Sequence, residues 1–179
     1  PPRTTRKASW AASDGYTRQN LQLAALVVID VFLLPRRWRG VGVGVATGFK
    51  LTPGIFALWY LVTGQFKAAL RAAAAGLVTI AIGLAVMPTA SWEYWTHYML
   101  TPNRLGGLTW AGNQSLSGML LRLGHGNLTL VWLVLVALCC ALAGIASRRL
   151  WQEGGADQVW SLLCAGLCGC LVSPGSWSH

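Results

Sequence analysis

The chain has 179 residues, of which 54% are hydrophobic and only 11% are charged, and its formal net charge is +9. This composition excludes an ordinary water-soluble domain and indicates an all-α integral membrane protein, since several runs approach the ~20 apolar residues that cross a bilayer. The basic residues stand in short clusters between apolar runs, as in cytoplasmic membrane loops, so we expect a lipid bilayer and no nucleic acid as partner.

The N-terminal part begins with a polar, irregular segment over residues 1–19, which we expect outside the membrane. An apolar run over residues 20–35 follows; it is short for a full span and contains Asp30. An acid within a membrane segment is by default a functional candidate. Asp30 lies near the basic end of its run, however, so we favour a structural role in which it pairs with Arg36 or Arg37.

Residues 40–61 are apolar and long enough to lie in the membrane, yet they carry Lys50 at their middle. A cation in hydrocarbon costs roughly 2.5–3.5 kcal/mol. Pro53 removes a backbone donor and disfavours helix at Thr52. Together these features predict a broken helix in which Lys50, at the break, faces an anionic group rather than lipid. We take the phosphate of a lipid-linked sugar as that group.

The remaining chain predicts further helices separated by polar segments. In order, we expect a span over 68–87, an external loop over 89–112, a short amphipathic helix over 113–123, a span over 128–147, a polar connection over 148–158 and a last apolar run over 159–172. The aromatic residues after Pro88 are typical of an interfacial helix. Glu93 and His97 are one helical turn apart, so they could pair with each other or contact a sugar.

The positions of the basic clusters predict a topology. If residues 41–62 crossed the membrane once, the clusters at 36–39 and 67–71 would fall on opposite sides, against the positive-inside rule. If that stretch enters and returns as a re-entrant hairpin, both clusters lie inside. The cluster at 148–149 then lies inside too, and the loop at 89–112 and the segment at 173–179 lie outside.

Several polar residues outside the apolar runs are candidates for binding a sugar or a phosphate. They are Arg104, Asn113, Gln114, Ser115, Arg122, Ser176, Trp177 and His179. Amides and a hydroxyl at a helix N-terminus suit such a ligand, although Asn113 could equally be a helix cap. The five cysteines all lie in apolar runs and lack paired CxxC spacing, so we predict helix packing for them and no metal site.

Three ordered motifs resemble those of glycosyltransferase family 87. They are KLTP at residues 50–53, NQSLxGxxxR at 113–122 and SPxSWxH at 173–179. The resemblance implies a polytopic GT-C fold in the plasma membrane with its active site at the outer face. It implies transfer of a sugar, most commonly mannose, from a polyprenyl-phosphate donor to a glycolipid or lipoglycan acceptor, without a further cofactor.

The resemblance also implies roles for individual residues. Lys50 would bind the donor phosphate, the polar candidates would line the substrate site, and His179 would contact the reacting centre. The family's catalytic aspartate lies upstream of anything here, so the general base is not assigned, and residues 1–179 are expected to be one membrane-embedded fragment of a longer transferase. Of the family's Gly-Gln-x-Asn pattern before the first helix, only Asn20 is kept. The alternatives are a transporter or flippase of lipid-linked sugars, or an inactive fragment.

Overall fold

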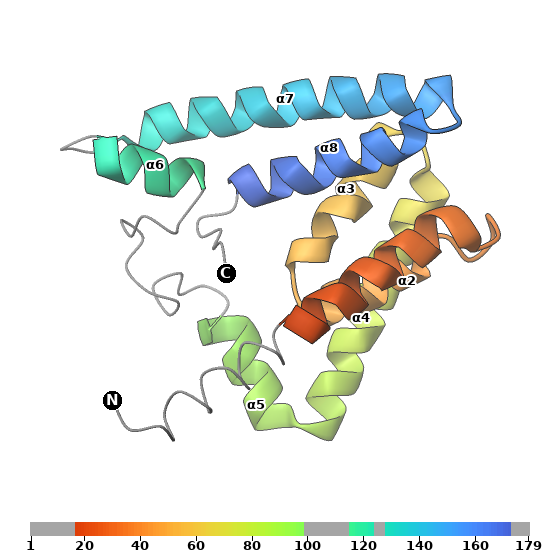
Figure 1. The fold of residues 1–179 in the computed structure, drawn as a ribbon. Coiled ribbons are helices and arrows are strands. Elements are labelled where there is room, and N and C mark those ends of the chain that lie inside the picture. The colour runs from red at the N-terminus through yellow and green to blue at the C-terminus, as the bar shows by residue number, and fades with distance from the viewer. Residues whose placement is uncertain (1–16, 99–114, 124–127, 173–179) are drawn as a thin grey trace, which may run out of the picture.

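The computed structural model describes residues 17–98, 115–123 and 128–172, and within these ranges every regular element is helical (Figure 1). The all-α prediction is therefore confirmed. A helix over residues 17–28 leads into the π-helical turn η1 (Ile29–Leu33). The elements that follow are α2 (Val41–Phe49), η2 (Thr52–Gly54), α3 (Ile55–Val62), α4 (Phe66–Val86), α5 (Pro88–Glu93), η3 (Tyr94–Tyr98), α6 (Leu116–Leu123), α7 (Thr129–Glu153) and α8 (Asp157–Val172).

Several helix boundaries differ from those predicted, and two of the differences are informative. The polar connection was expected to begin at Arg148, but α7 continues through Arg148 and Arg149 to Glu153. Arginine, leucine, glutamine and glutamate are all good helix formers, so the helix does not need to stop where its apolar side chains stop. The loop expected over residues 89–112 begins as helix, because α5 and η3 cover residues 88–98. A helix was expected for the aromatic residues there, and its place at a membrane interface stays a prediction.

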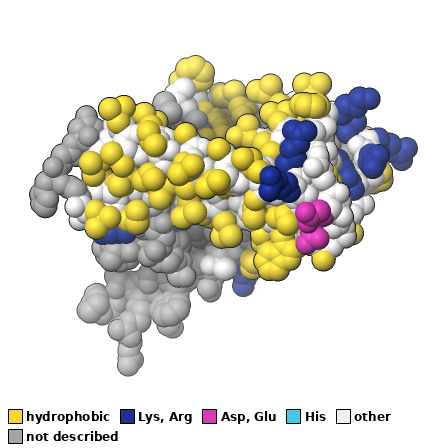
Figure 2. All heavy atoms as spheres, turned by 90° about the horizontal axis from the view of Figure 1, so that it is seen from above, with side chains coloured by type: hydrophobic (Ala, Val, Ile, Leu, Met, Phe, Trp, Pro, Cys, Tyr) yellow, Lys and Arg dark blue, Asp and Glu magenta, His cyan; other side chains and the backbone are white. Residues whose placement is uncertain are grey.

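The two longest helices, α4 and α7, are long and apolar enough to cross a membrane. No residue in the apolar window of α7 is buried inside the molecule. Its leucines therefore face outward, and Leu130 for example is 77% exposed. A continuous apolar surface of this kind needs lipid as its surroundings. Figure 2 shows this apolar surface, with most of the visible Lys and Arg side chains gathered at one end of it.

Helices α2 and α4 pack against each other through small residues. Helix α2 and its N-cap carry a glycine at every fourth position: Gly40, Gly44 and Gly48. Residues four apart lie on the same face of a helix. A Cβ atom at Gly44 would overlap the carbonyl of Ala72 and lie 2.7 Å from the Cβ of Ala75. The contact therefore brings backbone against backbone, as small residues allow between membrane helices.

The second half of the molecule is joined to the first by polar contacts between buried residues. Helices α7 and α8 lie side by side, and α3 packs beneath them (Figure 1). Trp59 of α3 donates its indole N–H to Ser161 Oγ of α8 at 2.9 Å. Ser161 Oγ in turn donates to the carbonyl of Ser147 in α7 at 2.6 Å. In an apolar environment such satisfied hydrogen bonds fix how α3, α7 and α8 meet.

Candidate functional site

The predicted helix break is present at Lys50. Helix α2 ends at Phe49, and Lys50 itself is extended, with φ −151° and ψ 129°. The chain re-enters helix through η2, where Pro53 occupies a position at which the missing N–H costs no helical hydrogen bond. The break therefore comes from the residues that predicted it, and it places Lys50 between two short helices.

Helices α2 and α3 fold back on each other as a hairpin. Asp30 Oδ2 accepts hydrogen bonds from Gly40 N at 2.8 Å and from Tyr60 Oη at 2.6 Å. Gly40 begins α2 and Tyr60 lies near the end of α3. The start of one helix and the end of the other therefore meet at one carboxylate, while Lys50 lies at the far tip.

The hairpin brings the basic clusters to the same end of the molecule. Arg71 of α4 donates from Nη1 to the carbonyl of Arg36 at 2.7 Å and to that of Arg39 at 3.3 Å. Trp151, which follows Arg148 and Arg149 in α7, lines the same cavity as these arginines. The three clusters therefore lie at one end of the described part of the chain, an arrangement that a re-entrant stretch requires, and the side of the membrane on which they lie stays a prediction.

Asp30 has a structural role, but the predicted partners were wrong. Its side chain is fully buried. Besides Gly40 N and Tyr60 Oη, it accepts from Gly42 N at 2.9 Å through Oδ1. The first N–H groups of a helix have no partner within the helix, and the helix dipole favours an anion there. Asp30 therefore caps α2, although it lies ten residues before Gly40, the N-cap of that helix. The short distance in sequence from Asp30 to Arg36 and Arg37 suggested a different partner.

Lys50 lies at one end of an elongated groove. Its ammonium donates to Asn20 Oδ1 at 3.0 Å, and both side chains are half-buried. The groove has a volume of about 400 Å³ and lies between the helix over residues 17–28, the η2–α3 segment and α8. Except for these two residues and Thr52, its lining is apolar and includes Leu23, Val27, Phe56, Leu163 and Leu167. A cation and an amide at one end of an apolar groove suit an amphiphile with an anionic head group.

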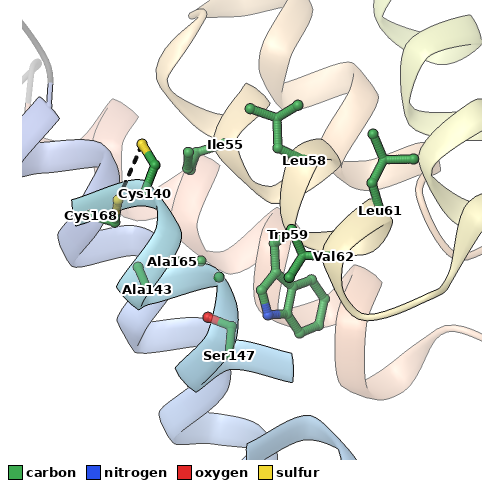
Figure 3. A pocket seen from close by; sticks show the side chains of 11 residues that line it. Ile55, Leu58, Trp59, Leu61, Val62, Cys140, Ala143, Ser147, Ala165 and Cys168 are labelled. Atoms are coloured by element: carbon green, nitrogen blue, oxygen red, sulfur yellow. Dashed lines mark hydrogen bonds between the residues drawn. The ribbon is translucent and has the colours of Figure 1, made fainter. Parts of the chain in front are cut away.

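A second groove lies on the other side of α3, between α3, α7 and α8 (Figure 3). Its volume is about 290 Å³, and Ile55 lines both grooves. Figure 3 shows Trp59 and Val62 of α3 opposite Ala143 and Ser147 of α7. Its lining contains no charged residue, so it offers nothing to hold a phosphate. Of the two grooves, only the one with Lys50 combines a chain-binding wall with a cation.

The other predicted site residues are not brought to this groove by the part of the chain that the structure describes. Ser115 is fully buried, and its Oγ accepts from Gly118 N at 3.1 Å. Ser115 therefore caps the N-terminus of α6. Arg122 is exposed in the last turn of α6 and does not line the groove. The remaining candidates lie outside the described residues: Arg104, Asn113, Gln114, Ser176, Trp177 and His179.

Asn20 is a candidate that the sequence analysis did not include among the site residues. It is thirty positions before Lys50, so spacing gave no reason to join the two. The sequence nevertheless contained a hint of a functional role, because Asn20 is the one residue of the family's Gly-Gln-x-Asn pattern that this chain keeps. Its side chain supplies the oxygen that orients the Lys50 ammonium.

Comparison with known proteins agrees with the motif resemblance. The sequence model of glycosyltransferase family 87 matches residues 9–174. A polyprenol-phosphate-mannose-dependent alpha-(1-2)-phosphatidylinositol mannoside mannosyltransferase of Mycolicibacterium smegmatis is 38% identical over 170 residues. The protein of the same description from Mycobacterium tuberculosis is 36% identical over 165 residues. Each alignment covers 89% of this chain.

A third relative from Mycobacterium tuberculosis, described as a phosphatidylinositol pentamannoside mannosyltransferase, is 34% identical over 165 residues. The chain spans only 38% of the length of the first two relatives and 36% of the third. No solved structure matches the chain.

Proposed function

The chain belongs to glycosyltransferase family 87, and from that premise we propose that it holds the donor in the transfer of mannose from a polyprenyl phosphate to a glycolipid or lipoglycan acceptor. The observation that carries the proposal is Lys50, which stands with Asn20 at the end of an otherwise apolar groove. The groove would hold the first part of the polyprenyl chain. Lys50 would hold the phosphate that links this chain to the sugar.

The role of Lys50 follows from where charge develops in the reaction. As the acceptor hydroxyl attacks the anomeric carbon, the bond from that carbon to the phosphate oxygen breaks, and polyprenyl phosphate leaves with additional negative charge. A cation held at that position stabilises the transition state more than the ground state. Lys50 would supply that charge without a metal ion. The hydroxyl proton passes to a general base that we do not assign.

Asp30 is unsuited to the role of this base. Its two oxygens accept three hydrogen bonds from Gly40 N, Gly42 N and Tyr60 Oη, and the side chain is fully buried at the opposite end of the hairpin from Lys50. A base must reach the acceptor hydroxyl within hydrogen-bonding distance. His179 remains our candidate for contact with the reacting centre.

The hairpin also suggests where the donor is held relative to the membrane. With the basic end inside, the tip points toward the outer face of a multi-pass plasma-membrane protein. Helix α2 has 9 residues, or about 13 Å at 1.5 Å each, which is nearly half of a ~30 Å hydrocarbon core. The donor phosphate would therefore be drawn into the protein below the outer surface, where a charge interaction is stronger than in water.

The test is transfer by the full-length protein in membranes, with polyprenyl-phosphate mannose as donor and a phosphatidylinositol mannoside as acceptor. We expect Lys50→Ala to lower turnover roughly 10²–10³-fold, the range seen when one group that stabilises developing charge is removed. Lys50→Arg should restore part of the activity, because it keeps a cation. Arg148→Ala removes one positive charge at the basic end and should leave turnover unchanged.

The elution of each variant on size-exclusion chromatography in detergent shows whether it is folded. If folded Lys50→Ala keeps wild-type turnover and donor affinity, the phosphate role is wrong.

A further inference from the structure

A second charged cavity lies at the basic end of the molecule. It has a volume of about 610 Å³ and lies between the turn before α2, the start of α4 and the last part of α7. Its lining includes five cationic side chains: Arg36, Arg37, Arg39, Lys67 and Arg71. Gln65 and Trp151 also line it, and no Asp or Glu does among the described residues. We call this cavity the arginine pocket.

The polypeptide around the arginine pocket is held in place by specific contacts. Arg71 joins α4 to the preceding turn through the carbonyls of Arg36 and Arg39. On the opposite wall, Trp151 packs edge-on against the buried ring of Trp59, with ring centroids 4.9 Å apart. The five cations therefore line one cavity whose backbone is held in place by Arg71 on one side and by Trp151, which packs against the core, on the other.

The position of the pocket points to the kind of ligand. It lies at the start of α4 and near the end of α7, where their apolar surfaces end. In a bilayer this is the level of the lipid head groups. Arginine forks match phosphate oxygens in geometry and charge. Basic pockets between membrane helices on the cytoplasmic side bind anionic lipid head groups.

We propose that the arginine pocket binds the phosphate head group of an anionic glycerophospholipid in the leaflet at the basic end. This lipid is neither the donor nor the acceptor of the proposed transfer. The length of α2, about 13 Å, separates the pocket from Lys50. The bound head group offsets the mutual repulsion of the five cations and ties together α4, α7 and the turn before α2.

The alternative is that these residues act only as a diffuse positive surface, as the positive-inside rule requires. The chain offers a matched control for this alternative. Arg148 and Arg149 lie at the same end of the molecule and are exposed, but neither lines the pocket. A diffuse surface would respond equally to the loss of either pair of charges, whereas a shaped pocket responds to its own residues.

The experiment measures binding of a fluorescent phosphatidylglycerol to the full-length protein in phosphatidylcholine nanodiscs. The test variant is Arg37→Gln with Lys67→Gln, and the control is Arg148→Gln with Arg149→Gln. At the strength typical of a basic residue near an anionic membrane surface, loss of two pocket cations weakens binding roughly 30-fold. We expect a clearly smaller change in the control, because Arg148 and Arg149 do not line the pocket. Neither pair is part of the donor site, so failure here leaves the proposed function standing.

Three results would overturn the proposal. Equal weakening in both variant pairs would assign binding to diffuse charge. Equally tight binding of uncharged phosphatidylcholine would show that the head-group charge is not recognised. Displacement of the lipid by inorganic phosphate alone, at matched phosphate concentration, would show that the pocket takes a soluble anion. Because the four substituted side chains are exposed, both variants are expected to fold, and detergent elution profiles check this.

Discussion

The base and the tip of the α2–α3 hairpin each hold one charged side chain within an apolar part of the molecule, but in different surroundings. At the base, Asp30 is fully buried and receives three hydrogen bonds from groups that belong to the fold. At the tip, Lys50 is half-buried, contacts the amide of Asn20 and lines an open groove. The charge that meets the base of the hairpin is therefore enclosed by the protein, whereas the charge at its tip lines a groove.

The difference shows how a charge in a membrane segment can be assigned to structure or to function. Both kinds are costly in hydrocarbon, so both need a reason to be retained. Asp30 stabilises the closure of the hairpin, because it satisfies backbone donors that α2 cannot satisfy itself. Lys50 is only half-buried, bonds to Asn20 and lines an otherwise apolar groove, which is why we propose a ligand-binding role for it.

The largest effect expected to separate the two ends is on stability. Asp30→Ala leaves the buried amide of Gly40, the half-buried amide of Gly42 and the Tyr60 hydroxyl without their acceptor, at about 1–3 kcal/mol each. We expect a loss of at least about 3 kcal/mol in the free energy of unfolding, and a smaller loss for Lys50→Ala, because the Lys50 side chain is only half-buried. Thermal unfolding midpoints in detergent measure both. A loss for Lys50→Ala as large as that for Asp30→Ala would remove the distinction between the two ends.

A second prediction concerns the groove that extends from the tip. Gly166 in α8 lines the Lys50 groove, and Gly144 in α7 lines the groove of Figure 3. An added Cβ would be at ordinary contact distance at both positions, 3.5 Å from Phe56 and 3.7 Å from Val62. Valine at either position should therefore fold while filling one groove.

If the Lys50 groove holds the polyprenyl chain, Gly166→Val displaces a few of its carbons. At about 0.8 kcal/mol per buried CH₂, loss of two such groups raises the donor KM roughly tenfold, with little change in kcat. Gly144→Val should leave both constants near their wild-type values. The opposite result, a raised KM for Gly144→Val alone, would place the chain in the groove of Figure 3 and detach it from Lys50.

Much of the tip could be predicted from the sequence because its causes are local. A lysine next to Leu-Thr-Pro in an apolar stretch is enough to break a helix, and the structure has the break at that residue. The return of the chain could be inferred as well, since the positive-inside rule favours one side of the membrane for the charges at residues 36–39 and 67–71. Backbone preference and charge placement are properties of the sequence itself.

What could not be predicted depends on contacts between distant residues. The partners of Asp30 lie 10, 12 and 30 positions away, and a nearby arginine was the more obvious choice from sequence. The same reason hid Asn20, which meets Lys50 only because the first helix packs beside the hairpin tip. Ser115, predicted as a ligand contact, is instead buried as a helix cap, since motif membership does not reveal which side chains face inward.

The smallest expected effect refines the account of the base. Tyr60→Phe removes one donor to Asp30 and leaves the bonds from Gly40 N and Gly42 N in place. A single hydrogen bond contributes about 0.5–1.5 kcal/mol net, so we expect a loss of about 1 kcal/mol, clearly below that for Asp30→Ala. Tyr94→Phe removes a hydroxyl from an exposed ring and is the matched control. An unchanged unfolding midpoint for Tyr60→Phe would show that the carboxylate holds α2 alone and that α3 is positioned by Trp59 and Ser161 instead.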